Sequence, residues 1–379
     1  GSDAPGDRSS SGGGAAEVLG VFLRLGATAF GGPAAHVALM EEEFVRRRRW
    51  LSRTELLDLV ASAQLIPGPN STELAIHLGY RRAGWRGLIA AGIGFILPAV
   101  LLTALLAWAY ARFGALVGVA GALAGAKAVA FVVVLRALWD FGRSALTTRW
   151  RIALSVGALA ASLIGADELV ILGVAVLLGL ATVRRGAGAA APAGYPLLAR
   201  LAPALAGAPT LPALLLTFLK FGAVLFGSGY VLLAFLHGDL VDRLHWLTDR
   251  QLLDAVAAGQ LTPGPVFSTA TFVGYLVAGG RGAAIATIGI FLPAFVFVAV
   301  SGPIISRWKD APAFRATLDA VIAASLGLMG AVTVLLGRTG ITSWATLALA
   351  AAAALALWRW RLNVAWVLVA GVAIGWLMR

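Results

Sequence analysis

Two Pro-Gly-Pro tripeptides interrupt otherwise apolar stretches of the sequence, and each is followed by side chains that can donate hydrogen bonds to oxygen atoms. The tripeptides are Pro67, Gly68 and Pro69, and Pro263, Gly264 and Pro265. The donors are Asn70, Ser71 and Thr72 after the first tripeptide, and Ser268 and Thr269 after the second. Because proline lacks an N–H group and clashes with the preceding turn, each tripeptide must end one helix and begin another. The new helix starts with unpaired N–H groups and the positive end of its dipole, so we expect it to favour an anion.

The two tripeptides belong to an internal duplication. Gln64 to Pro69 matches Gln260 to Pro265, and matches on both sides keep nearly the same spacing. They include Phe22 to Gly26 against Phe218 to Gly222, Gly79-Tyr80 against Gly274-Tyr275, and Leu97 to Ala99 against Leu292 to Ala294. We therefore divide the chain into four parts. These are a disordered N-terminal segment that starts with what looks like a tag-cleavage scar (1–16), an N-terminal repeat (17–185), a linker (186–210) and a C-terminal repeat (211–379).

The composition indicates an all-α polytopic membrane protein. Hydrophobic residues make up 60% of the 379 residues and charged residues only 13%, more apolar surface than a soluble chain could bury. The Gly and Ala content suits helices that approach closely in lipid, whereas an outer-membrane barrel would show short alternating strands. A net charge of +12 would suggest nucleic acid in a soluble protein. Here the arginine clusters flank apolar stretches, so we assign them to membrane topology and expect no nucleic-acid partner.

Each repeat is predicted to contain about five transmembrane helices and one broken helical hairpin. The arms of the first hairpin, 54–66 and 70–81, are shorter than the ~20 residues that cross a bilayer, so we expect the hairpin to be re-entrant. The first helices are expected at 17–40 and 211–236, the long helices at 87–112, 116–146, 282–306 and 313–337, and the short helices at 152–165, 169–183, 344–357 and 364–378.

The arginine distribution predicts that the two repeats have inverted topology. An odd number of spans turns the second repeat upside down relative to the first, as in many secondary transporters. The first loop carries Arg46 to Arg49 and Arg53, whereas its counterpart carries Arg243 and Arg250 beside three aspartates. Since basic loops stay on the cytoplasmic side, the linker is expected inside and both termini outside.

Three basic side chains lie within predicted spans. Arg24 and Lys220 occupy equivalent positions in the first helices, where they could complement an anion or extend toward the nearer membrane interface. Lys127 is near the middle of its span, where a charge is costly, and this favours a role facing the bundle interior or the transport pathway.

Other polar residues have both a functional and a structural interpretation. Glu73, Asp58 and Asp254 could relay protons, or they could serve only to stabilise helices. His36 is more often a hydrogen-bonded structural residue than a titrating one. The serine and threonine hydroxyls could simply cap their helices, and the breaks could be kinks satisfied by neighbouring helices.

Five motifs of the N-terminal half occur together. They are Phe30-Gly31-Gly32-Pro33 with His36, an acidic and basic loop ending at Trp50, Pro67-Gly68-Pro69 with Ser71-Thr72, Gly79-Tyr80, and Phe95-Ile96-Leu97-Pro98. In this combination the chain resembles the chromate ion transporter (CHR) family in its long, two-domain form, from about Glu17 to the C-terminus. The resemblance implies chromate export across the inner (plasma) membrane of a bacterium or archaeon, giving chromate resistance, with sulfate as a competing or related anion.

The second half departs from the family pattern, with Ser228-Gly229 for Gly32-Pro33, Leu232 for His36 and Val266 for Asn70. We therefore expect the first half to dominate the chemistry. The leading hypothesis is a secondary transporter for chromate, and the alternatives are a transporter or exchanger of sulfate or another oxyanion, or an anion channel on the same scaffold. An enzyme is disfavoured because the sequence has no Cys, no HExxH motif and no nucleotide loop, so no catalytic residue, metal or cofactor is expected. The Gly- and Ala-rich helices leave room for a homodimer.

Overall fold

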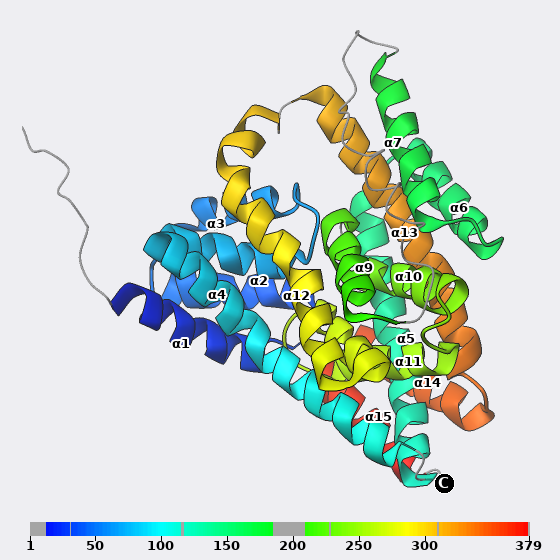
Figure 1. Cartoon of the computed structure of the whole chain (residues 1–379). Coiled ribbons are helices and arrows are strands. Elements are labelled where there is room, and N and C mark those ends of the chain that lie inside the picture. The colour runs from blue at the N-terminus through cyan, green and yellow to red at the C-terminus, as the bar shows by residue number, and fades with distance from the viewer. Residues whose placement is uncertain are drawn as a thin grey trace, which may run out of the picture.

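The computed structural model describes residues 13–30, 32–114, 117–184, 209–226, 229–308 and 311–377, which form helices and connecting turns without a strand (Figure 1). Most of the predicted disordered segment and of the linker lies outside the described residues. Helix α1 begins at Gly13, so the last residues of the segment predicted to be disordered are helical.

The two repeats contain matching series of helices. The first consists of α1 (Gly13–Thr28), α2 (Pro33–Met40), the π-helix η1 (Glu41–Arg47), α3 (Arg53–Ala63), α4 (Asn70–Phe113), α5 (Val117–Ala145), α6 (Arg149–Leu163) and α7 (Glu168–Arg184). The second consists of α9 (Leu211–Val224), η3 (Gly229–Val231), α10 (Leu232–Leu236), the π-helix η4 (His237–Arg243), α11 (Asp249–Leu261), η5 (Val266–Ser268), α12 (Thr269–Trp308), α13 (Pro312–Gly340), α14 (Trp344–Trp358) and α15 (Val364–Leu377).

The first helix of each repeat is interrupted, which differs from the continuous helices expected at 17–40 and 211–236. Helix α1 ends at Thr28, and α2 begins at Pro33 after Gly32, whose φ of 81° favours glycine. Helix α9 ends at Val224, and Leu225 is extended. Proline supplies the physical reason in the first repeat, because a residue before proline is disfavoured in the helical region. Each repeat therefore contains two helix breaks and not one.

A tight turn separates the second hairpin arm from the long helix that follows it. Within α4, Ala83 and Gly84 leave the helical conformation. A Cβ placed on Gly79 or on Gly87 would overlap the backbone carbonyl of the other, so the two glycines let the arm fold back closely on the long helix. Helix α12 turns in the same way at Ala278 and Gly279. The position of the turn agrees with the boundary predicted between 81 and 87.

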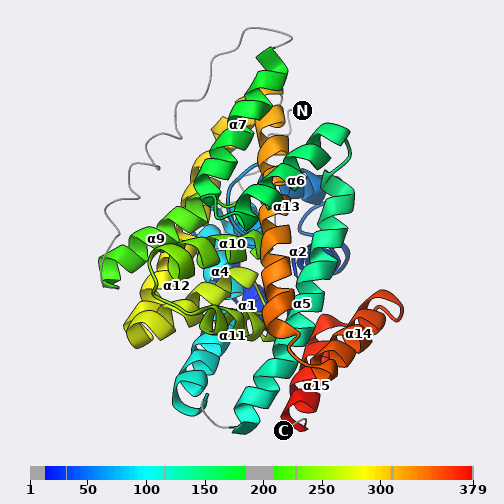
Figure 2. The ribbon, with the colours of Figure 1, turned by 90° about the vertical axis from the view of Figure 1, so that its right-hand side faces the viewer.

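The repeats are interlocked by the long helices. Helix α5 of the first repeat packs against α14 and α15 of the second, and α13 of the second packs against α6 and α7 of the first (Figure 2). Gly121 and Gly125 on α5 meet Gly371 and Gly375 on α15 so closely that a Cβ on any of the four would approach the opposite backbone within 3.4 Å. Small residues allow this approach.

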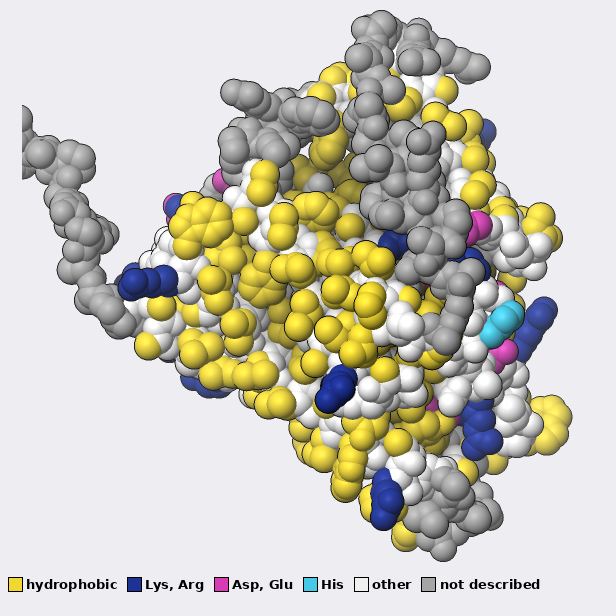
Figure 3. All heavy atoms as spheres, viewed as in Figure 1, with side chains coloured by type: hydrophobic (Ala, Val, Ile, Leu, Met, Phe, Trp, Pro, Cys, Tyr) yellow, Lys and Arg dark blue, Asp and Glu magenta, His cyan; other side chains and the backbone are white. Residues whose placement is uncertain are grey.

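Four described helices are long and apolar enough to cross a membrane, within Asn70–Phe113, Ala120–Ala145, Val266–Val300 and Pro312–Gly340. The shorter apolar helices are α7, α9, α14 and α15, and the break after α9 leaves it 14 residues. Four described helices thus reach the length of a full span, and α6, α7, α14 and α15 lie where the sequence predicts short helices. Large hydrophobic side chains such as Ile89, Ile93 and Ile288 are exposed on α4 and α12, and Figure 3 shows apolar atoms covering this face. Such a surface suits lipid.

Candidate functional site at the paired helix breaks

Each Pro-Gly-Pro break is bonded to the interrupted first helix of the other repeat. The Gly68 N–H donates to the carbonyl oxygen of Leu225, at the end of α9, over 2.7 Å. Reciprocally, the Gly264 N–H donates to the carbonyl oxygen of Ala29, at the end of α1, over 2.8 Å. Four helix breaks therefore meet at the boundary between the repeats, and the two hydrogen bonds are reciprocal.

The alanine of the Leu-Pro-Ala motif of each repeat packs against the glycine of the opposite break. A Cβ on Gly264 would lie 2.9 Å from the Ala99 Cβ, and one on Gly68 would lie 3.7 Å from the Ala294 Cβ. Gly68 and Gly264 also have φ values of 136° and 96°, which residues with side chains rarely adopt. The conformation therefore favours glycine at both positions, and close packing against the opposite repeat adds to this requirement at Gly264.

Buried polar atoms without a partner gather after the first break. Ser71, Thr72 and Glu73 are at most 3% exposed. Among the described residues, no hydrogen-bond partner is present for Asn70 Oδ1, Thr72 Oγ1, either Glu73 carboxyl oxygen or, one turn later, His77 Nε2. Since buried polar groups are normally hydrogen-bonded, this concentration of unsatisfied atoms is unusual for a purely structural helix start. It marks the first turn of α4 as a candidate binding site.

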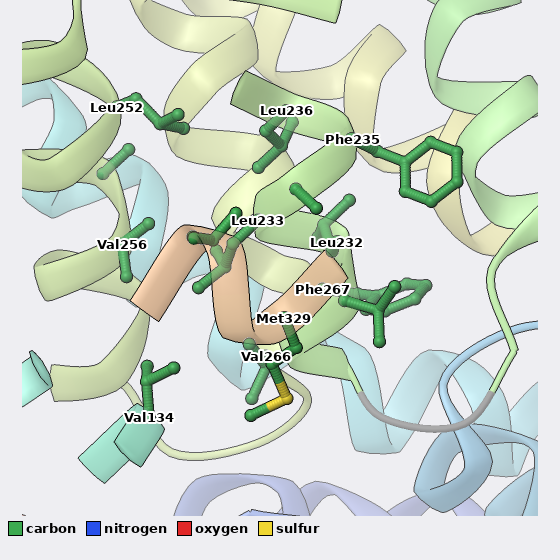
Figure 4. Packing of buried hydrophobic residues seen from close by; sticks show 14 of the residues in the cluster. Val134, Leu232, Leu233, Phe235, Leu236, Leu252, Val256, Val266, Phe267 and Met329 are labelled. Carbon is green, nitrogen blue, oxygen red and sulfur yellow. The ribbon is translucent and has the colours of Figure 1, made fainter. Parts of the chain in front are cut away.

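The second break is packed and mostly satisfied. Its first turn, η5, buries Val266 and Phe267 among Leu232, Leu233 and Met329 (Figure 4). The Ser268 hydroxyl lies 3.4 Å from Thr103 Oγ1, and the Thr262 hydroxyl lies 3.3 Å from the same atom. Thr269 Oγ1 has no partner in the described chain. Each break is thus followed by one threonine hydroxyl without a partner, and the first break differs because Asn70 Oδ1 and both Glu73 oxygens are also unsatisfied.

The three basic side chains predicted near an anion are each paired with a carboxylate. Arg24 Nη2 lies 2.5 Å from Glu43 Oε1, Lys127 Nζ lies 2.6 Å from Asp254 Oδ1, and Lys220 is paired with Asp239. Glu43 and Asp239 are buried and occupy equivalent positions in η1 and η4. The Arg24 and Lys220 pairs therefore repeat the same interaction in both halves.

The acidic side chains proposed for coupling lie in different surroundings. Asp254 is fully buried on α11, where it also accepts a hydrogen bond from the Tyr110 hydroxyl over 2.8 Å. Its counterpart Asp58 is exposed on α3. His36 is 1% exposed and its Nε2 lies 3.0 Å from the Ala29 carbonyl oxygen, the same oxygen that accepts the Gly264 N–H. This contact places His36 beside the second break and not the first.

The sequence reasoning did not single out Glu43, Asp239 or His77. A comparison of equivalent positions could have found the first two, because both repeats carry an acid 19 residues after the basic residue of the first helix. His77 gives no such signal, because α12 has no histidine. Among the described residues, no group of three His, Asp or Glu side chains could hold a metal ion.

The fold and the site together define an all-helical, multi-pass membrane protein built from two interlocked repeats with broken helices. The family model described as chromate transporter matches residues 16–180 and 212–376, so the chain belongs to the chromate transporter family and the resemblance seen in the sequence is confirmed. A chromate transport protein of Cupriavidus metallidurans is 34% identical over 85% of this chain and 83% of its own length. One of Pseudomonas aeruginosa is 32% identical over 96% and 92%. No solved structure matches the chain.

Proposed function

We propose that this protein is a secondary transporter that exports chromate, a tetrahedral dianion, across the inner membrane and so confers resistance. The single observation that carries the binding site is the cluster of unsatisfied polar atoms at the first turn of α4. The names of its relatives support the substrate, and their description as transport proteins argues against an enzyme.

The anion would bind at the N-terminus of α4. The first N–H groups of a helix have no intrahelical acceptor, so those of Asn70 and Ser71 are available to an oxyanion together with the Ser71 and Thr72 hydroxyls. The dipole of the arm adds roughly half an elementary positive charge at this end. Gly68 permits the close approach, because a Cβ there would overlap the Glu73 carboxyl and fill the space. The second break, with Gly264, Ser268 and Thr269, would mainly hold the first helix in place.

Glu73 is the candidate for coupling to protons. Its carboxyl is fully buried next to Gly68, and neither oxygen has a partner in the described chain. A carboxylate ~4 Å from an anion is repelled by ~4 kcal/mol per unit charge at an effective dielectric constant of 20. The dianion would therefore bind when Glu73 is protonated, and the loss of that proton would favour release. Asp58, Asp254 and His36 would contribute through the movement of the arms.

The unequal burial of the two first arms supports alternating access. Helix α3 is largely exposed, whereas α11 is buried beneath α5 through Lys127 and Asp254. In inverted-repeat transporters the two halves exchange such roles between states. The proposed topology places both termini outside and the linker inside, and the exposed apolar face of α4 and α12 would contact lipid or a second copy in a homodimer.

Chromate uptake into inverted membrane vesicles tests the site. We expect Asn70→Ala and Ser71→Ala to impair uptake about tenfold or more, because a hydrogen bond to a charged group contributes ~1.5–3 kcal/mol. Ser268→Ala is the matched control and should retain most of the activity at equal protein level. Unchanged uptake in both first-break variants would contradict the assignment.

Sulfate and chromate flux measured side by side in proteoliposomes would identify the preferred oxyanion, and current without saturable exchange would indicate a channel.

A further inference from the structure

A cavity of about 520 Å³ lies beneath the turn between α6 and α7, and neither Pro-Gly-Pro break contributes a residue to its lining. Its walls come from that turn, from α10 and η4, and from α13. The charged and titratable groups that line it are Asp167, Glu168, His237, Asp242, Arg243 and Arg338. The cavity therefore brings a short loop of the first repeat onto the π-helix of the second.

Glu168 lies between this cavity and a buried ion pair. Its carboxyl group packs directly on the backbone of Gly238, where an added Cβ would overlap both carboxyl oxygens. The next residue is Asp239, which is 4% exposed and pairs with Lys220 and Arg243. Glu168 thus lines the cavity and packs against Gly238, the residue next to Asp239 of the buried Lys220–Asp239 pair.

The surroundings of Glu168 favour its protonated form. Burial, the largest cause, raises the pKa of the Glu168 carboxyl from 4.5 to about 8. The carboxylates of Asp167 and Asp239 raise this pKa as well, and Lys220 lowers it. His237 is held by Asp242 and Asp249, at 3.0 and 2.9 Å, and Arg243 by Asp239 at 2.7 Å. These groups are therefore engaged with other partners around the cavity.

The equivalent cavity in the other half has a different chemistry. About 310 Å³ in volume, it is enclosed by the turn between α14 and α15, by α2 and by α5. Its charged residues are Arg136 and Asp140, and Asn363 is the polar side chain that the turn contributes. The turn between α14 and α15 thus contributes no carboxyl group to its cavity, whereas the turn between α6 and α7 contributes Asp167 and Glu168.

We propose that Glu168 is a proton-binding site filled from the 520 Å³ cavity, and that its charge controls the Lys220–Asp239 ion pair. When Glu168 loses its proton, its carboxylate repels that of Asp239 and competes for Lys220. Lys220 lies in the last turns of α9, and Leu225 directly follows this helix and accepts the hydrogen bond from the Gly68 N–H. A proton at Glu168 is thereby linked to the position of the first break. The link to transport, though not the proton site itself, rests on the proposed function.

Thermal unfolding at a series of pH values tests the proton site without any substrate. A carboxyl whose pKa is higher in the folded than in the unfolded protein lowers stability as pH rises between the two values. Between pH 5 and 8, the melting temperature of the wild type should therefore fall by several degrees more than that of Glu168→Gln. Arg338→Gln, which removes an exposed charge from the same cavity without removing a group that titrates in this range, should behave as the wild type. Equal pH slopes for Glu168→Gln and the wild type would overturn the proposal.

A second variant, Gly238→Ala, keeps the Glu168 carboxyl group and so separates its protonation from other effects of the Glu168→Gln substitution. In Gly238→Ala the added methyl group pushes the Glu168 carboxyl toward water, so the pH-dependent loss of stability should move to lower pH. Chromate flux in proteoliposomes, measured at a series of pH values, then tests the link to transport. The flux of Glu168→Gln should persist but depend less on pH than the flux of the wild type. If the flux of Glu168→Gln depends on pH as steeply as that of the wild type, the link to transport is overturned even when the stability data support the proton site. If the wild type itself shows no chromate flux, only the proposed function is overturned.

Discussion

The two Pro-Gly-Pro breaks have the same backbone design but different side chains after it. After Pro69 the chain continues with Asn70, Ser71, Thr72 and Glu73, whose buried polar atoms are mostly unsatisfied. After Pro265 it continues with Val266 and Phe267, which fill an apolar core, and with Ser268, which lies within hydrogen-bonding distance of Thr103. The two copies of a duplicated element can thus differ in their surroundings. The first has buried polar atoms without partners, and the second is packed in an apolar core. The first arms differ in the same sense, since Asp58 is exposed and Asp254 is buried.

The largest expected difference between the halves concerns these two aspartates. Asp254→Ala leaves Lys127, whose side chain is 15% exposed, without its carboxylate, and the loss of one partner of a buried pair costs ~3–5 kcal/mol of stability. Asp58→Ala changes an exposed residue and should cost less than ~0.5 kcal/mol. Chemical denaturation in detergent measures both values, and equal losses would contradict the comparison. The double variant Lys127→Met with Asp254→Leu should recover most of the stability lost in Asp254→Ala.

A smaller effect is expected at the hydroxyl groups after the two breaks. Thr72→Val removes an unsatisfied hydroxyl at nearly constant volume, so it should weaken chromate binding about tenfold and leave stability unchanged. Ser268→Ala removes a hydroxyl that interacts within the protein, so it should cost ~0.5–1.5 kcal/mol of stability and leave binding unchanged. Equilibrium binding and thermal unfolding of the purified variants separate the two outcomes. The reverse pattern would assign the ligand to the second break.

The smallest signal is expected from cross-linking in a second conformation. In this conformation α3 would be buried as α11 is now, and α11 would be exposed. Ile322 on α13 is equivalent to Lys127 on α5, so a state with α3 buried would bring Ile322 toward Asp58 as Lys127 now meets Asp254. The chain has no Cys, so the pair Asp58→Cys with Ile322→Cys can be introduced cleanly. Because Lys127 and Asp254 meet through their side-chain tips, we test proximity with a short bifunctional thiol reagent and not with a direct disulfide. We expect the reagent to cross-link the pair slowly, with a yield that changes when chromate is added. The pair Lys127→Cys with Asp254→Cys is the control for the present state, and failure of only the first pair would argue against the exchange.

Much of this architecture could be predicted from the sequence because it depends on local rules. Proline and glycine determine where α3 ends and α4 begins, and the duplication predicted the same break before η5. The break between α1 and α2 was missed, since Gly32-Pro33 was recognised as a family motif but not as a helix interruption. The missed break also explains why the first helix of each repeat is shorter than predicted.

The partners of the charged residues could not be predicted, because they depend on contacts between distant parts of the chain. Lys127 and Asp254 are 127 residues apart and belong to different repeats, and no local pattern connects them. The ring of contacts around Glu168 depends in the same way on how the first repeat docks on the second. By contrast, Asn70 and Glu73 follow the break directly, and their role stays a prediction that the proposed variants test.

The exchange of backbone hydrogen bonds between the breaks has a consequence for assembly. Gly68 relies on Leu225 and Gly264 relies on Ala29, so neither half of the chain satisfies its own amide at the break. If the N-terminal half were synthesised alone, its Gly68 N–H would lack an acceptor until the C-terminal half was present in the same membrane. A gene divided between the repeats should therefore give a working protein only when both fragments are produced in the same cell.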